Sequence, residues 1–353
     1  METRKIQTVG GGTYTVSLPK EWAESENCTA GTTVNLHTHI DGLLVIQTPE
    51  SQTTARNRLR LEVGNDDPAE IEQLLRAAYA AGVESVVLEV PDGYSDEQHR
   101  AIERVTRNLT GVTVAEATES QVTVRTMLDA GEVSVSQSVR QLQFVALSMH
   151  RDAMAALTTG TTGDRWADRD EQADRLYAMI DRYFERGLAR LDEIDALGLT
   201  RPELFTLWGT ANELERVADH AERIGTVADR LDGQPDERII TALDSIAQDV
   251  HAVVEDAVRV IIGDACVDTA RQTLATRRDV RERITSLDRQ LFESGDADYR
   301  LTRALDSLAR TAEHGGNIAE FGLRMAVRDG ALSDPATDTD EANASSSTAE
   351  TES

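Results

Sequence analysis

The sequence is poor in lysine, cysteine and aromatic residues. Lys5 and Lys20 are the two lysines among 36 basic residues, whereas 63 residues are acidic and the formal net charge is −27. An acidic, lysine-poor and aromatic-poor chain is what a molar-salt cytoplasm selects, so we expect a halophilic protein. An ordinary acidic cytosolic protein would explain the charge but not the missing lysine. Cys28 and Cys266 show no paired spacing, which favours free thiols over a disulfide or redox pair.

The sequence also lacks the patterns of a membrane protein and of common enzymes. It contains no run of about twenty apolar residues and no charged-then-apolar leader, so we expect a soluble, cytoplasmic protein without membrane insertion. There is no Ser/His/Asp or Cys/His triad and no glycine-rich phosphate loop. We therefore do not expect an enzyme. Pairs of acidic residues, described below, are the sole feature that could support a metal-dependent reaction.

The segment 213–225 has the pattern of an amphipathic helix with an acidic edge. Its apolar residues recur at three- and four-residue steps, and Glu215 and Asp219 project from one face of consecutive turns. A related segment, 307–319, aligns at an offset of 94 residues (314 − 220), which matches His220 with His314. An acid–His pair at one offset inside two helical patterns predicts an internal repeat.

These segments resemble the signature of the PhoU family of phosphate-uptake regulators. The signature is an acid, three spacers, Asp-His and a later Asn-Ile-Ala on the third helix of a three-helix bundle. The resemblance implies tandem three-helix bundles with metal-binding acid clusters on helix faces. The first copy departs from it at Arg223, where the motif has Asn, and the second has Ala309 in place of the leading acid.

From about Ser134 to Asp329 the pattern is helical throughout, as that resemblance requires. Six helices fit, at about 134–159, 165–196, 201–231, 236–262, 266–293 and 298–328.

The second of these helices offers a further acid pair. Asp170 and Asp174 are four residues apart, and PhoU-like proteins carry a comparable pair there. Together with Glu215 and Asp219 they would supply four oxygen ligands, which suit magnesium, manganese or iron. A solvated acidic face is the alternative on so acidic a chain. In the second repeat Arg283 follows Asp279 by four residues, so the full pair is missing.

The first fifty residues read as short strands and turns around one helix. The run 12–22, with its Ser-Leu-Pro-Lys core, and the later Asp-Gly turn resemble the AbrB/MazE-type swapped-hairpin DNA-binding domain. That family dimerises by interleaving hairpins and reads DNA with basic residues, which implies Arg4, Lys5 and Lys20 here. A dimerisation barrel without DNA binding is the alternative. We expect His37 and His39 to be a solvated pair on one side of a strand.

The sequence thus predicts a multidomain chain. A swapped-hairpin β-barrel occupies 1–50, a small α/β module 51–130, tandem all-α three-helix bundles 131–330, and a disordered acidic tail 331–353.

By resemblance, the homodimer would bind promoter DNA and restrain phosphate uptake through the ATPase of a phosphate ABC transporter or a related regulator. The alternative is a dimeric interaction module that acts on the transporter without contacting DNA.

Overall fold

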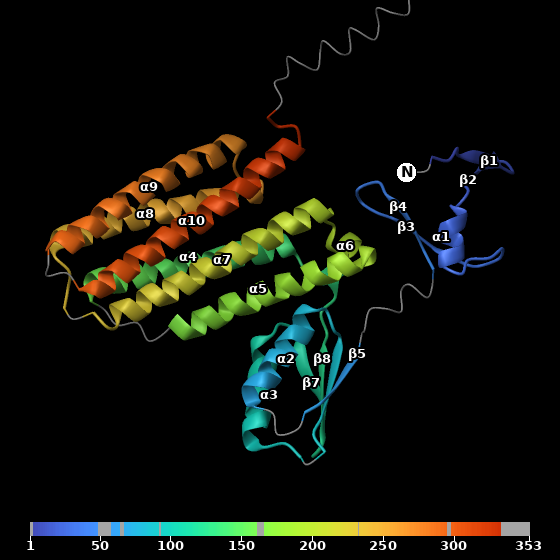
Figure 1. Cartoon of the computed structure of the whole chain (residues 1–353), viewed down its shortest axis with the longest axis horizontal. Helices are drawn as coiled ribbons and strands as arrows, with labels where there is room; N and C mark the ends of the chain where they lie inside the picture. The colour runs from blue at the N-terminus through green and yellow to red at the C-terminus, as the bar shows by residue number, and fades with distance from the viewer. Residues whose placement is uncertain are drawn as a thin grey trace, which may run out of the picture.

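A computed structural model of the chain shows three regions in chain order: a small N-terminal region, a mixed sheet with two helices, and a large group of long helices (Figure 1). It describes residues 3–48, 58–63, 67–91, 93–160, 166–231, 233–294 and 298–332. The predicted disordered tail lies outside the described residues from position 333 onward.

The N-terminal region consists of two hairpins joined by a short helix. Strands β1 (Gln7–Val9) and β2 (Thr13–Thr15) pair antiparallel, as do β3 (Asn35–Thr38) and β4 (Leu44–Gln47), and α1 (Lys20–Ser25) lies between them in the chain. The two hairpins remain separate two-stranded sheets, so residues 3–48 of a single chain form no closed barrel. The interleaved barrel that the sequence predicts requires a second copy of the chain.

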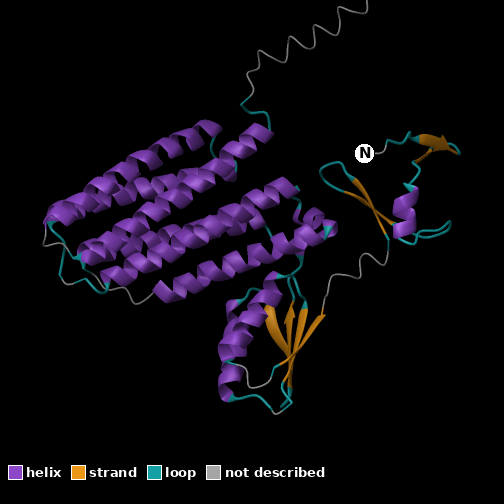
Figure 2. Ribbon diagram, in the orientation of Figure 1, coloured by secondary structure: helices purple, strands orange, loops and turns teal. Residues whose placement is uncertain are grey.

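The mixed α/β module has a four-stranded sheet in the order β5-β6-β8-β7 (Figure 2). Only the pair β5–β6 is parallel, because α2 is the crossover that joins these two strands. The elements in chain order are β5 (Arg58–Glu62), α2 (Pro68–Ala80), β6 (Ser85–Glu89), α3 (Asp96–Asn108), β7 (Val112–Ala117) and β8 (Gln121–Thr126).

Side-chain caps mark the starts of both helices in this module. The Asp67 side chain accepts a hydrogen bond from the backbone of Ala69 at the start of α2. Ser95 and Gln98 form a reciprocal capping box at the start of α3. Each cap satisfies backbone N–H groups that the first turn of a helix leaves without partners.

The helical region follows the sequence pattern with one interruption. Its helices are α4 (Val135–Thr159), α5 (Trp166–Ala189), α6 (Leu191–Leu197), α7 (Arg201–Ala228), α8 (Glu237–Ile261), α9 (Val267–Ser294) and α10 (Tyr299–Arg328). The single helix expected over 165–196 is therefore wrong. It breaks at Arg190, whose backbone is extended, because Gly187 packs against Leu204 and Ile194 and the chain folds back there.

Two three-helix bundles result, and they share a seam. Helices α4, α5 and α7 form bundle one, α8, α9 and α10 form bundle two, and α7 lies antiparallel against α10 (Figure 1). The apolar core crosses this seam, since Ile318 of α10 packs into the core of bundle one and Ile224 of α7 into that of bundle two. Within the described residues, no helix is long and apolar enough to cross a lipid bilayer.

Histidines from the two bundles meet in pairs along the seam. His220 stacks on His314, its counterpart in the repeat, with ring centroids 5.4 Å apart. His150 Nδ1 lies 2.8 Å from His251 Nε2. Burial, followed by neighbouring histidine and arginine side chains, lowers the pKa of His220 to about 4, and burial with Arg151 lowers that of His251 to about 4. His220 and His251 are therefore neutral at physiological pH.

Candidate functional site

The four carboxylates predicted as metal ligands lie half-buried between α5 and α7. Asp170 and Asp174 project from α5, and Glu215 and Asp219 from α7. Each pair flanks a core position of its own helix: Ala173 and Leu214 are buried beside them. The spacing of four residues thus brings the acids together at the edge of the packed interface.

Burial, and then neighbouring carboxylates, raise the pKa values of Asp170, Asp174 and Glu215. The pKa of Asp170 rises to about 7, first through burial and then through Asp174 and Glu222. The pKa of Glu215 also rises to about 7, through burial, Asp219 and Asp174. Proximity of like charges disfavours ionisation of each carboxylate, and a cation nearby would relieve it.

A cation is already supplied to one of these acids by the α/β module. Helix α2 packs against α5, and Arg76 of α2 lowers the pKa of Asp174, although burial raises it on balance. Neither Arg76 nor Glu222 was among the predicted site residues. Glu222 lies one turn beyond the predicted pair on the same helix, so the helical spacing alone could have identified it.

The donor set suits a hard divalent ion in part. One oxygen of Asp170, Oδ1, is buried and has no hydrogen-bond partner among the described residues, which is unfavourable unless a ligand satisfies it. Nevertheless, across the described ranges no three histidine, cysteine or carboxylate side chains converge closely enough to hold a metal ion. The structure brings the four predicted acids to one face without forming a closed coordination shell.

In bundle two the corresponding face is lined by arginines. Arg277, Arg278 and Arg281 of α9 lie opposite Ala309 and Glu313 of α10 around a hollow of about 300 Å³. By the repeat offset, Ala309 and Glu313 are the counterparts of Glu215 and Asp219.

Asp279 and Arg283 of α9, which the sequence aligned with Asp170 and Asp174 of α5, do not line this hollow. Arg283 forms an ion pair with Asp249 of α8 and donates a hydrogen bond of 2.8 Å to Ser245 Oγ. It therefore faces α8 rather than α10, and the correspondence based on Asp279 and Arg283 is wrong. Arg277 faces α10 instead. Gly316 of α10 has no side chain, so Arg277 can lie across that helix, and a Cβ on Gly316 would come within 2.2 Å of Arg277 Cδ.

The residues of the repeated signature hold the seam together. Glu213 Oε2 of α7 accepts hydrogen bonds from His314 Nδ1 at 2.6 Å and from Asn317 Nδ2 at 3.1 Å. The counterpart of Asn317 is Arg223, whose Nη2 lies 3.6 Å from Asp219 Oδ2 on its own helix. Asn317 of bundle two thus contacts bundle one, whereas its counterpart Arg223 contacts a residue of its own helix.

The predicted DNA-binding residues are all exposed. Arg4 and Lys5 precede β1, and Lys20 is the first residue of α1. Lys20 Nζ lies 3.5 Å from Glu24 Oε1 one turn along that helix. A pair this exposed contributes little to stability, so the lysine remains accessible to another partner.

The prediction of a solvated histidine pair is wrong for His39. Its side chain is buried, with Nδ1 bonded to Asp195 Oδ1 of α6 and Nε2 2.8 Å from Asp41 Oδ1. Asp195 Oδ1 also accepts a hydrogen bond of 3.2 Å from the backbone of Ile40. The N-terminal region is therefore joined to the helical region through this carboxylate.

Helix α6 also holds the α/β module. Glu193 of α6 pairs with Arg186 of α5, and the same guanidinium donates to the Gly82 carbonyl and lies 3.3 Å from a Glu84 carboxylate oxygen. One turn earlier, Arg182 is 1 % exposed and donates to the carbonyls at the end of α2 and the loop after it, Tyr79 and Val83. All three regions meet around these seven residues of α6.

Comparison with known proteins identifies two of the regions. The PhoU domain model matches residues 139–228, and the model of the MazE bacterial antitoxin, which recognises its toxin, matches residues 7–54. No curated protein matches the chain.

Two solved structures are similar to the helical region. PhoU from Pseudomonas aeruginosa is 21 % identical, with a TM-score of 0.49 over 55 % of this chain and 96 % of that one. The phosphate transport system regulatory protein PhoU from Streptococcus pneumoniae is 15 % identical, with a TM-score of 0.38 over 57 % and 96 %. On its two family matches, the chain joins a MazE-type antitoxin domain to a PhoU domain.

Proposed function

We propose that this protein is a phosphate-responsive regulator of phosphate uptake, whose N-terminal region binds promoter DNA as a dimer and whose helical region restrains phosphate transport. The observation that carries this proposal is the union of a MazE-type domain with a PhoU domain in one chain. The contact between His39 and Asp195 supports it, because it joins the two regions physically.

The exposed apolar surface of the N-terminal region supports a homodimer. Tyr14 is 76 % exposed and Leu36 62 % exposed, and their neighbours Ile6, Val9 and Leu44 are also open to solvent. A region this small cannot bury its own apolar side chains, and a second copy with interleaved hairpins would cover them. The basic residues Arg4, Lys5 and Lys20 would then face DNA from a shared surface.

In the helical region, the partner would be the ATPase of a phosphate ABC transporter or a related regulator. The carboxylates Asp170, Asp174, Glu215 and Asp219 would hold a magnesium, manganese or iron ion. Such an ion would neutralise acids whose pKa values are raised by burial and by neighbouring carboxylates, and would tie α5 to α7. The role of the ion would therefore be to stabilise the face of α5 and α7 to which the partner docks, rather than to catalyse a reaction.

One observation favours a second function, a dimeric interaction module that acts on the transporter without contacting DNA. Residues 3–48 contain three basic residues, against the four acids Glu21, Glu24, Glu26 and Asp41. The balance of charge in this region does not attract DNA. At molar salt, however, counterion release contributes little to binding, so DNA recognition there depends on local contacts more than on net charge.

A promoter-occupancy experiment separates these two functions. We expect the full chain to occupy discrete promoters across the chromosome and to protect them in a footprint in molar potassium chloride. The triple variant Arg4→Ala, Lys5→Ala and Lys20→Ala should lose this protection. A matched triple variant of exposed arginines elsewhere, Arg100→Ala, Arg107→Ala and Arg238→Ala, should retain it. Occupancy at no promoter, or equal loss in both variants, would leave the interaction module as the function.

Phosphate uptake tests the regulatory role directly. Cells that lack the gene should take up phosphate faster than the wild type in phosphate-rich medium, because the restraint on transport is removed. Unchanged uptake and unchanged expression of the transporter would contradict the proposal.

A further inference from the structure

The two ends of the seam between α7 and α10 are related by the internal repeat. Because these helices run antiparallel, the start of α7 lies against the end of α10, and the end of α7 against the start of α10. At the offset of 94 residues each position at one end has a counterpart at the other. The two ends therefore offer a direct comparison within one molecule.

Aromatic side chains fill the first end. Phe184 stacks on Trp208 at 4.3 Å, and Phe205 lies edge-on to Phe321 at 5.9 Å between ring centroids. Gly209 lets the ring of Phe321 approach the helix, since a Cβ there would come within 2.7 Å of Phe321 Cζ. Aromatic rings therefore pack against one another at this end of the seam.

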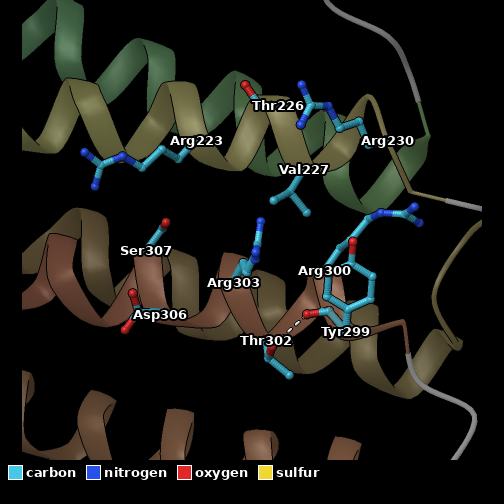
Figure 3. Close-up of a pocket in the computed structure, with 10 residues that line it drawn as sticks. All are labelled: Arg223, Thr226, Val227, Arg230, Tyr299, Arg300, Thr302, Arg303, Asp306 and Ser307. Carbon is cyan, nitrogen blue, oxygen red and sulfur yellow. Dashed lines mark hydrogen bonds between the residues drawn. The ribbon is translucent and has the colours of Figure 1, made fainter.

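The counterpart end carries smaller residues and is hollow. Val227 stands at the position equivalent to Phe321, and Thr302 at that of Trp208. Tyr299, the counterpart of Phe205, is 62 % exposed and does not close the gap. A pocket of about 580 Å³ lies here between α7 and α10 (Figure 3). Its size is in the range of small-molecule sites and exceeds what a single phosphate ion needs.

Arginines dominate the walls of this pocket. Four of them, against one carboxylate, that of Asp306, line it in a chain of net charge −27: Arg223, Arg230, Arg300 and Arg303. Figure 3 shows Val227 pointing down from α7, and Arg303 and Ser307 pointing up from α10, into the space between the helices. Arg303 also stands where the filled end has Gly209, so this difference places a cation at the hollow end.

The arginines differ in how far they are already neutralised. Arg300 pairs with Asp298 at 2.8 Å, and Arg223 approaches Asp219 on its own helix. By contrast, Arg230 and Arg303 form no ion pair with any carboxylate in the described part of the chain, and Arg303 lies 5.7 Å from the ring of Tyr299. Two guanidinium groups on opposite walls are thus available to an anion.

We propose that this pocket binds a small compound with two or more phosphoryl groups, such as a nucleoside polyphosphate or short polyphosphate. Guanidinium groups bind phosphate oxygens in bidentate fashion, and the hydroxyls of Thr226 and Ser307 add neutral donors beside them. The pocket spans both bundles, so an occupant ties α7 to α10 at the end that aromatic packing does not close. As the sensing site of a phosphate-responsive regulator, it rests on the function proposed above.

Calorimetric titration of the full chain in molar potassium chloride tests this inference without reference to DNA or transport. Tripolyphosphate, ATP, inorganic phosphate and sulfate are the probes. We expect tripolyphosphate or ATP to bind, and Arg230→Gln or Arg303→Gln to weaken binding about ten- to hundredfold, because each removes a charge-assisted contact. The control Arg281→Gln, an exposed arginine of the α9 hollow, should leave affinity unchanged.

A second variant tests the pocket by shape rather than charge. Val227→Phe copies the aromatic plug of the other end, and should abolish binding while circular dichroism shows an unchanged helix content. Inorganic phosphate that binds as tightly as tripolyphosphate, with the same dependence on Arg230 and Arg303, would overturn the requirement for two or more phosphoryl groups.

Three results would overturn the inference. They are absence of binding by every phosphate probe, equal binding of sulfate, and equal loss of affinity in Arg281→Gln. Competition by duplex DNA for the same arginines would also overturn it, in favour of a nucleic-acid surface. If the pocket binds phosphates but the protein protects no promoter, the proposed function is refuted while the inference about the pocket stands.

Discussion

The two three-helix bundles share one plan and differ in the charge of the same face. In bundle one, Glu215 and Asp219 edge the interface of the second and third helices, with two acids opposite. Burial, and then neighbouring carboxylates, raise the pKa values of Asp170 and Glu215 there. In bundle two the first of these positions is Ala309, and three arginines stand opposite. The two bundles thus keep one packing plan, while the charge of this face is reversed.

The largest expected effect tests whether the two bundles are one folding unit. Leu214 and Leu308 are counterparts, both fully buried. Either Leu214→Ala or Leu308→Ala should lower the free energy of unfolding by about 2–5 kcal/mol, because each leaves a cavity in a packed core. Since both cores cross the seam, urea unfolding followed by circular dichroism should show one transition for the helical region, shifted in both variants. Two separate transitions, of which each variant moves only one, would show that the bundles are independent.

Removal of divalent ions should have the next largest effect, and it should distinguish bundle one from bundle two. A metal present at a hundredfold excess over its dissociation constant stabilises the native state by about 2.7 kcal/mol, which corresponds to a melting shift of about 5–10 °C. We expect a chelator to lower the melting temperature of the manganese-loaded wild type by this amount. The variant Glu215→Ala with Asp219→Ala should be insensitive to it.

Acids of bundle two provide the controls for this experiment. Asp306→Ala or Glu313→Ala should retain most of the chelator sensitivity, because neither removes a carboxylate of bundle one. Equal loss from these changes would place the site elsewhere, and chelator-insensitive melting of a metal-loaded wild type would reduce the acid pairs to a solvated face.

A smaller effect is expected from pH in the absence of divalent ions. The pKa of Asp170 is raised from 3.8 to about 7 in the folded state, so its contribution to stability is present below about pH 3.8 and is lost as the pH rises through about 7. Asp170→Asn should therefore flatten the decline in melting temperature across this range. The difference should be about 1 kcal/mol or less, because the group is half-exposed. Asp279→Asn, an exposed acid of bundle two, should follow the wild-type curve; if it flattens equally, the effect belongs to net charge rather than to the site.

The smallest effect concerns the ion pair between Arg283 and Asp249. Both side chains are about 40 % exposed, and such pairs contribute a few tenths of a kcal/mol. Arg283→Gln should change the urea midpoint of unfolding no more than Arg281→Gln, which breaks no ion pair among the described residues. A loss above about 1 kcal/mol would show that this contact orders bundle two.

Local patterns predicted the helices and the acid face, because both depend on residues a few positions apart. Three- and four-residue steps indicated the helices of the two bundles, and the four-residue acid steps brought Asp170, Asp174, Glu215 and Asp219 to one face. The break at Arg190 was missed because Gly187, the glycine beside it, lies inside an uninterrupted helical pattern. It arises from the packing of Gly187 against Leu204, which only the folded chain brings about.

Features that join distant segments could not be predicted in the same way. The burial of His39 depends on Asp195, 156 residues away in the sequence. The arginine pocket depends on the antiparallel arrangement of α7 and α10. The repeat offset identified the counterparts of Phe321 and Trp208, but the sequence alone did not show that these positions face one another across a seam.

Helix α6 carries a consequence for how the regions communicate. Its Asp195 binds the N-terminal region, and its Glu193 binds the arginine that holds the α/β module. A displacement of this helix must alter both contacts together, so the free energies of the N-terminal region and of the α/β module are coupled. By thermodynamic linkage, a ligand that changes DNA affinity through α6 by some factor will have its own affinity changed by DNA by the same factor. Promoter DNA would thus act as an effector of the helical region, as well as a target that the helical region controls.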